Sequence, residues 1–246
     1  MNSYVICTTP RSGSNLLCDY LSSTGLFGSP AEFMNPRTAK HFADRWGCVD
    51  ESGVINFGAY LDRLLKVMRT SNGVFGMKIL HDDYYHFRAF PAFRQFLERT
   101  KLIYLTRKDK VRQAVSYYIA SRTGQWIHTD IPNVSVDAIE FDSAAIETEM
   151  AMLIEHDVRW RVFFAMLNVT PLEIYYEDII NDPRGVVSEV GRFLNVDCER
   201  ATIETRLQSQ SSEFSVAFAD SVRVSMRERE FRVVDQISYQ GFQFIC

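Results

Sequence analysis

The chain has 246 residues, 46% of them hydrophobic, which is enough for the core of one large α/β domain or two small ones. Its 27 basic and 31 acidic side chains give a net charge of −4, so the chain has no overall positive field that would attract nucleic acid. Nucleic acid is therefore not expected as a partner. Five scattered cysteines without a Cys-x-x-Cys pair argue against a disulfide scaffold and a zinc site. We find no signal sequence and no apolar run of about 20 residues, so we expect a cytoplasmic protein without an integral membrane segment.

Short apolar segments alternate with helical patterns along most of the chain. The expected strands are Tyr4–Thr8, Val74–Leu80, Lys101–Thr106 and Leu172–Tyr176. The expected helices are Ser14–Thr24, Ala59–Thr70, Tyr84–Glu98, Lys110–Thr123, Ser143–Leu167 and Pro183–Leu194. This alternation predicts an α/β fold, a parallel sheet flanked by helices, in which ligands bind at the carboxyl ends of the strands. No linker or repeat interrupts the pattern, so a single domain is expected.

The first strand leads into a loop of small and basic residues that includes Arg11 and Gly13, just before the first helix. Backbone N–H groups and the positive end of the helix dipole meet at such a turn. Gly13 lets the backbone approach an oxygen closely, and Arg11 adds a forked cation. The loop therefore predicts a phosphate or sulfate site. The alternative is an ordinary strand-to-helix turn that binds nothing.

A second basic element follows the third strand. Arg107 leaves that strand, and Ser116 lies about two turns into the next helix, so both could hold a further phosphate. Two such sites suit a nucleotide with phosphates at both ends of its ribose. A P-loop kinase needs Gly-Lys-Ser/Thr and an acidic strand end for magnesium, whereas Ser14 follows Gly13 and the third strand ends in Arg107. We therefore expect no metal in the mechanism.

Several segments, in order, resemble the sulfotransferases that use 3′-phosphoadenylyl sulfate, in particular the bacterial branch represented by trehalose 2-sulfotransferase. TTPRSGSNLL resembles that family's 5′-phosphosulfate loop, with Arg where animal enzymes have Lys, and LTRKDKVRQAVSYYIA resembles its 3′-phosphate motif. TGLFGSPAEFM, NGVFGMKIL and YYEDI match further segments. The resemblance ends near Phe214. It implies a P-loop-like sulfotransferase domain over residues 1–214. Residues 215–246, beyond the resemblance, are expected to form a C-terminal tail of the same domain.

The resemblance also implies roles for individual residues. The 5′-phosphosulfate would be held by Arg11, Ser12, Gly13, Ser14 and Asn15. Arg107 and Ser116 would hold the 3′-phosphate. Glu32, in the Pro-x-Glu-Phe segment, would be the general base that takes the proton of the acceptor hydroxyl, for which a carboxylate of ordinary acidity suffices. The alternative for Glu32 is a surface or capping carboxylate.

Lys78 lies within the apolar second strand, at the end expected to face the ligand. A lysine in that setting seldom lies buried without a partner. It is a third catalytic candidate beside Glu32 and Arg11, because it could neutralise charge on the bridging oxygen or orient the sulfuryl group. The alternative is a structural salt bridge with Glu177 or Asp178.

The activity implied is transfer of a sulfuryl group from 3′-phosphoadenylyl sulfate to a hydroxyl of a carbohydrate or glycolipid. The resemblance also implies that the chain could form a homodimer, as members of this branch often do. Two alternatives stay open: a P-loop-like small-molecule kinase, and a catalytically silent nucleotide-binding or interaction protein on the same fold.

The remaining candidates are aromatic, histidine and arginine residues. Trp46, Trp126 and the pair Tyr117-Tyr118 could line a sugar site, but at helical spacing they are more typical of a core. The segment 125–128, Gln-Trp-Ile-His, is the preferred acceptor-site loop. His81-Asp82-Asp83 is interpreted as a loop rather than a metal or base cluster, because no partner is evident. The arginine-rich segment 221–232 is expected to be a solvated helix and tail.

Overall fold

The computed structural model describes residues 2–127, 129–205, 213–230, 236–239 and 242–245. By their contacts the residues form two compact units. The first consists of Met1–Lys110 and Met152–Ser209, and the second of Val111–Ala151 and Gln210–Cys246.

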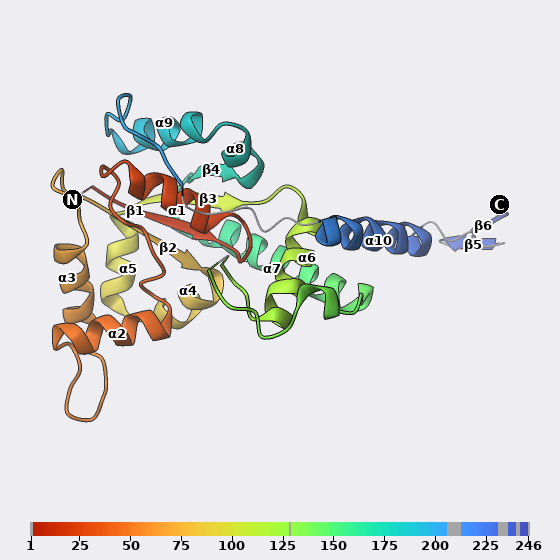
Figure 1. Ribbon diagram of the computed structural model, residues 1–246, viewed down its shortest axis with the longest axis horizontal. Coiled ribbons are helices and arrows are strands. Elements are labelled where there is room, and N and C mark those ends of the chain that lie inside the picture. Colours follow the sequence, from red (N-terminus) through yellow and green to blue (C-terminus); the bar gives the residue numbers. More distant parts are fainter. Residues whose placement is uncertain (1, 128, 206–212, 231–235, 240–241, 246) are drawn as a thin grey trace. The chain divides into compact units, whose positions relative to one another are not determined.

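The first unit contains a four-stranded parallel sheet in the order β2-β1-β3-β4 (Figure 1). The strands are β1 (Asn2–Thr8), β2 (Val74–Leu80), β3 (Lys101–Thr106) and β4 (Leu172–Tyr175). Thr8 lies opposite both Leu80 and Leu105, and Thr106 lies opposite Tyr175, so all four strands end at one edge of the sheet. The predicted parallel α/β sheet is confirmed, with β2 and β3 at their predicted bounds.

Helices cover both faces of this sheet because consecutive residues of β1 are apolar and point alternately to opposite sides. Tyr4 and Ile6 pack with α1 (Ser14–Ser23) and α9 (Pro183–Leu194). Val5 and Cys7 belong to the core on the other face. That core takes side chains from α2 (Pro36–Trp46), α3 (Phe57–Val67), α5 (Pro91–Glu98) and the later turns of α7 (Ser143–Leu167). Figure 1 shows α1 and α9 on the opposite side of the sheet from α3 and α5.

The structure corrects the predicted helix over Tyr84–Glu98. It is two helices, α4 (His81–Phe87) and α5, because Pro91 cannot continue a helix and Phe90 before it is extended, with ψ 121°. Two further helices of this unit were not predicted. Asn35 caps α2 by accepting a hydrogen bond from the Arg37 amide, and α8 (Tyr176–Asn181) follows β4 directly.

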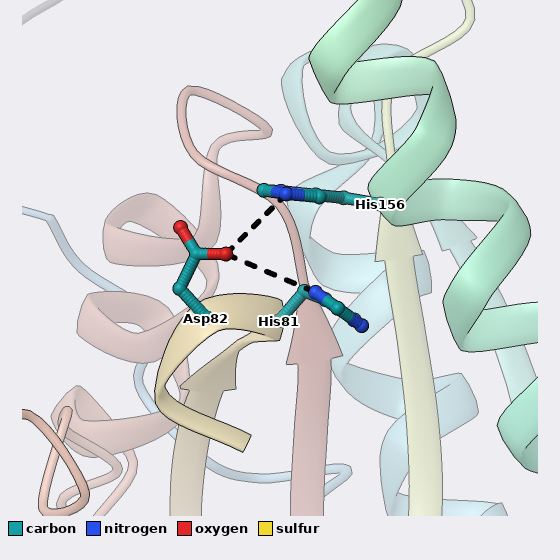
Figure 2. Close-up of side chains that lie close together, drawn as sticks. All are labelled: His81, Asp82 and His156. Atoms are coloured by element: carbon teal, nitrogen blue, oxygen red, sulfur yellow. Dashed lines mark ion pairs between the residues drawn. The ribbon is translucent and has the colours of Figure 1, made fainter. Parts of the chain in front are cut away.

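The interpretation of His81-Asp82-Asp83 as a loop without partners is wrong. These residues form the first turn of α4, and His81 and Asp82 face His156 of α7 (Figure 2). His156 follows so much later in the sequence that their proximity could not be inferred from spacing.

The second unit contains most of α6 (Lys110–Thr123), the first turns of α7, a 3-10 turn at Val136–Ala138 and α10 (Glu213–Glu230). Phe218 of α10 packs against the rings of Phe141 and Tyr118. The expected arginine-rich helix is α10, although residues 231 and 232 lie outside the described residues. An antiparallel hairpin of β5 (Gln236–Tyr239) and β6 (Phe242–Ile245) follows it, which was not predicted. Within the described parts of the chain, no helix has the length and apolarity needed to cross a bilayer.

Candidate active site

The loop between β1 and α1 has a backbone suited to an anion. Arg11 has a φ of 60° and Gly13 a φ of 84°, so two residues close together adopt the left-handed conformation. That conformation is uncommon for a residue with a side chain and occurs often at functional sites. Gly13 is the N-cap of α1 and offers no side chain to cap the helix, so amides of its first turn can bind a ligand.

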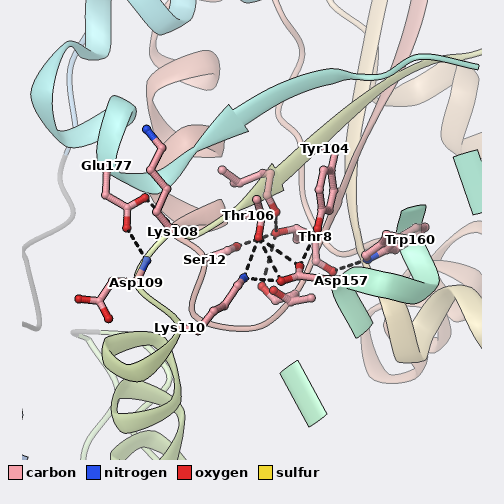
Figure 3. A network of polar contacts seen from close by, with 12 residues as sticks. Thr8, Ser12, Tyr104, Thr106, Lys108, Asp109, Lys110, Asp157, Trp160 and Glu177 are labelled. Atoms are coloured by element: carbon pink, nitrogen blue, oxygen red, sulfur yellow. Dashed lines mark hydrogen bonds and ion pairs between the residues drawn. The ribbon is translucent and has the colours of Figure 1, made fainter. Parts of the chain in front are cut away.

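Hydrogen bonds from the sheet hold this loop in place (Figure 3). The Thr8 hydroxyl donates to the carbonyl of Leu105 at 2.7 Å, so Ser12 Oγ, 2.6 Å away, donates to Thr8 Oγ1. The indole N–H of Trp160 donates to the Thr8 carbonyl at 2.8 Å. Because Ser12 is fully buried, its hydroxyl anchors the loop to Thr8.

Lys78 joins the start of α1 to Glu32. Its Nζ lies 2.9 Å from Glu32 Oε1 and 3.4 Å from Ser14 Oγ, and it also contacts Asn15 Oδ1. The Lys78 side chain is 5% exposed and that of Glu32 31%. The Lys78 amide donates to the carbonyl of Ala31 at 3.1 Å, which fixes the segment before Glu32 against β2. Four predicted site residues therefore meet at one point.

The alternative prediction, a structural salt bridge of Lys78 with Glu177 or Asp178, is wrong, because Lys78 pairs with Glu32. Glu177 accepts hydrogen bonds from the backbone amides of Lys108 and Asp109, at 3.0 and 3.1 Å. Asp178 pairs with Lys108 Nζ at 2.9 Å. The YYEDI segment thus fixes the backbone that follows β3, a role that its acidic composition alone did not indicate.

Two arginines and a tyrosine extend the site from the loop toward β3. Burial, and then the charge of Arg107, lower the pKa of Arg11, so the two cations feel each other's field. The guanidinium carbon of Arg107 lies 4.5 Å from the centre of the Tyr176 ring. That ring covers Gly13 so closely that a Cβ there would lie 2.4 Å from Tyr176 Cδ2. Neighbouring cations of this kind are stabilised by an anion between them.

Asp83 is a buried carboxyl group that the sequence analysis did not place in the site. It is 7% exposed, and its Oδ2 has no hydrogen-bond partner among the described residues. Burial, and then the charges of Glu32 and Asp82, raise its pKa to about 7, while Lys78 acts in the opposite direction. Asp83 is therefore close enough to Glu32 and Lys78 for their charges to affect it. The signal available was its position just after the carboxyl end of β2.

The other predicted residues lie apart from this group or belong to the second unit. Trp46 packs on Phe42 and Tyr60 and belongs to the core, as the alternative predicted. Ser116 lies on α6 in the second unit, so its joint action with Arg107 stays a prediction. Trp126 is 43% exposed, and Asp130 Oδ2 holds its loop by accepting from backbone amides; His128 lies outside the described residues.

A family model confirms what this geometry indicates. Residues 3–225 match the model of the Stf0 sulphotransferases. The chain belongs to the Stf0 sulphotransferase family. The family match extends beyond Phe214, where the resemblance in the sequence analysis ended. Membership confirms a sulfotransferase that uses 3′-phosphoadenylyl sulfate, and it decides against the small-molecule kinase.

Curated relatives and a solved structure agree with this membership. This Stf0 sulphotransferase is 26% identical to the trehalose 2-sulfotransferase of Mycolicibacterium smegmatis, over 86% of this chain and 92% of the relative. It is 25% identical to the trehalose 2-sulfotransferase of Mycobacterium tuberculosis, over 89% and 94%. Its fold is similar to that of the sulfotransferase domain from the curacin biosynthetic pathway, with a TM-score of 0.50 and 16% identity over 89% of this chain and 96% of that one.

Proposed function

We propose that this chain transfers a sulfuryl group from 3′-phosphoadenylyl sulfate to a carbohydrate hydroxyl, with Glu32 as the general base. The observation that carries the proposal is the position of Lys78, whose Nζ contacts both the first turn of α1 and, at 2.9 Å, Glu32. The helix start is the expected donor site, so this single ammonium group places the base next to it.

The donor's 5′-phosphosulfate binds the amides at the start of α1 and the Arg11 guanidinium. Arg107, which shares the field of Arg11, binds the 3′-phosphate. The Tyr176 ring packs on both Gly13 and Arg107 and thereby fixes the spacing between these elements. A donor with phosphates at both ends of its ribose satisfies this distribution of cations, and β3 itself ends in Leu105-Thr106 without an acidic residue.

Transfer then follows a direct displacement. The acceptor oxygen forms a bond to sulfur while the bond from sulfur to the phosphate oxygen breaks, and the electron pair of that bond stays on the phosphate. Glu32 takes the proton of the attacking hydroxyl, a contribution of about 10²–10⁴-fold in such reactions. Lys78 and Arg11 stabilise the negative charge that develops on the leaving phosphate oxygen.

The acceptor site is proposed on the side of Glu32 where Asp83 lies. A buried carboxylate oxygen with no partner among the described residues is an acceptor for a second hydroxyl of a sugar. Both curated relatives are named for trehalose, so trehalose is the first acceptor to test, followed by other sugars and glycolipids.

A transfer assay with radiolabelled donor and a panel of these acceptors tests the function. A labelled sugar or glycolipid, with release of adenosine 3′,5′-bisphosphate, would support it. Tight binding of ATP with magnesium and none of the bisphosphate would contradict the donor assignment. Binding of the bisphosphate without transfer to any acceptor would favour the catalytically silent alternative.

A further inference from the structure

Three side chains outside the proposed transfer chemistry meet at the carboxyl end of β2 (Figure 2). Asp82 Oδ1 lies 3.3 Å from His156 Nε2 and 3.8 Å from His81 Nδ1. One ligand atom from each residue can be chosen so that all three lie within 4.8 Å of one another. Two come from the first turn of α4 and the third from α7, so the cluster joins two separate helices.

The two histidines are buried and incompletely bonded. His81 is 4% exposed and His156 7%. His81 Nδ1, the nitrogen that faces Asp82, has no hydrogen-bond partner among the described residues, because 3.8 Å is too long for a hydrogen bond. Buried polar atoms in native proteins almost always have a partner. This nitrogen therefore points to a ligand that is not part of the chain.

The atoms that the cluster offers indicate which kind of ligand it would bind. Two imidazole nitrogens and one carboxylate oxygen are typical ligands of zinc and related transition metals, whereas magnesium and calcium prefer oxygen. Zinc bonds of about 2.0–2.2 Å in a tetrahedral site place neighbouring ligand atoms roughly 3.4 Å apart. The Asp82–His156 pair at 3.3 Å meets this spacing, and the Asp82–His81 pair at 3.8 Å needs a contraction of a few tenths of an ångström. The nitrogens of His81 and His156, which lie within 4.8 Å of each other, must come to the same spacing.

The cluster is accessible to a cation from solvent. The Asp82 side chain is 69% exposed, so the cluster is open to solvent on that side. The two imidazole rings stack with their centres 4.8 Å apart and their planes at 30°. Coordination requires each ring to turn so that its nitrogen points at the metal, and the exposed carboxylate can follow this movement.

We propose that His81, Asp82 and His156 bind one divalent transition-metal cation of the zinc class, with water as the fourth ligand. The site ties the first turn of α4 to α7 and is separate from the Glu32–Lys78 pair, so it does not depend on the proposed transfer mechanism.

The test is a calorimetric titration of the chelator-treated full chain with Zn²⁺. The variants are Asp82→Asn, which removes an exposed ligand, and His156→Gln. The matched control is His86→Gln, since His86 is an exposed histidine on the same helix α4. Wild type and control should bind one equivalent of Zn²⁺, and both ligand variants should bind at least tenfold more weakly.

Two further readouts keep the test independent of folding defects. Zn²⁺ should raise the melting temperature of the wild type and the His86→Gln control by several degrees but leave Asp82→Asn unchanged. Co²⁺ should give the strong visible absorption of a tetrahedral site with the wild type but not with Asp82→Asn or His156→Gln. Stoichiometric binding that is equally tight in Asp82→Asn, or no stoichiometric binding by the wild type, would overturn the proposal.

Discussion

Replacing Lys78 by Met should lower the rate of sulfuryl transfer by about 10²–10³-fold, the usual effect of losing one preorganised donor to a developing oxyanion. The side chain is 5% exposed, so its charge acts in a poorly solvated site and water cannot replace it easily. Its loss also leaves Glu32 and Asn15 without the ammonium group that positions them. We therefore expect kcat to fall more than the affinity for adenosine 3′,5′-bisphosphate.

The same change should reduce stability only moderately. Removing one partner of a fully buried ion pair costs about 3–5 kcal/mol. Because the Glu32 side chain is 31% exposed, water can solvate the remaining carboxylate, and we expect about 1–3 kcal/mol. For a chain of this length that corresponds to a fall in Tm of several degrees, measurable by calorimetry.

Steady-state kinetics with varied donor and acceptor, together with calorimetric binding of the bisphosphate, separates the two effects. Lys40→Met is a suitable control, because it removes one positive charge from an exposed helical pair with Asp44. That control should keep its activity within about twofold of the wild type. A folded Lys78→Met protein with a kcat within about threefold of the wild type would refute the role given to Lys78.

Two further substitutions test the loop and the core, and a chemical modification tests a buried thiol. Gly13→Ala should weaken the binding of adenosine 3′,5′-bisphosphate at least tenfold. A residue with a side chain is strained at a φ of 84°, and its Cβ would clash with the Tyr176 ring. An unchanged affinity in calorimetry would contradict this. Gly76→Ala should lower the free energy of unfolding by about 1–3 kcal/mol, because its Cβ would lie 2.3 Å from the Tyr4 ring, and urea unfolding measures it. Burial raises the pKa of Cys18 to about 12, so iodoacetamide should modify it only after unfolding; rapid modification of the native chain would show that the site is open.

Much of the sheet could be predicted because its strands are short, apolar and bounded by clear helical patterns. Val74–Leu80 and Lys101–Thr106 matched at both ends for this reason. The predicted helix over Tyr84–Glu98 failed because the apolar pattern continues across a break that Pro91 imposes. The prediction relied on the hydrophobic pattern and did not take the backbone constraint at Pro91 into account.

The candidate site could be predicted in its parts but not in its pairings. The positions of Arg11 and Arg107 just after strand ends followed from the local sequence pattern, and their binding roles stay predictions. The Glu32–Lys78 pair depends on a loop that folds back so that the Ala31 carbonyl accepts the Lys78 amide, a contact that sequence spacing does not encode.

Tyr176 illustrates the same limit. It acts through its ring, which packs on Gly13 and on Arg107, and neither contact has a local signal. The acidic residues beside it drew attention to the YYEDI segment, but Glu177 accepts from backbone amides after β3 and Asp178 pairs with the side chain of Lys108.

The most direct test of the central claim is single-turnover sulfuryl transfer by Glu32→Gln with donor and acceptor prebound. The amide keeps the shape of the carboxylate but cannot take the proton, so transfer should fall by about 10²–10⁴-fold while calorimetric affinity for adenosine 3′,5′-bisphosphate stays within a few fold of the wild type. A transfer rate close to that of the wild type would show that Glu32 is not the base.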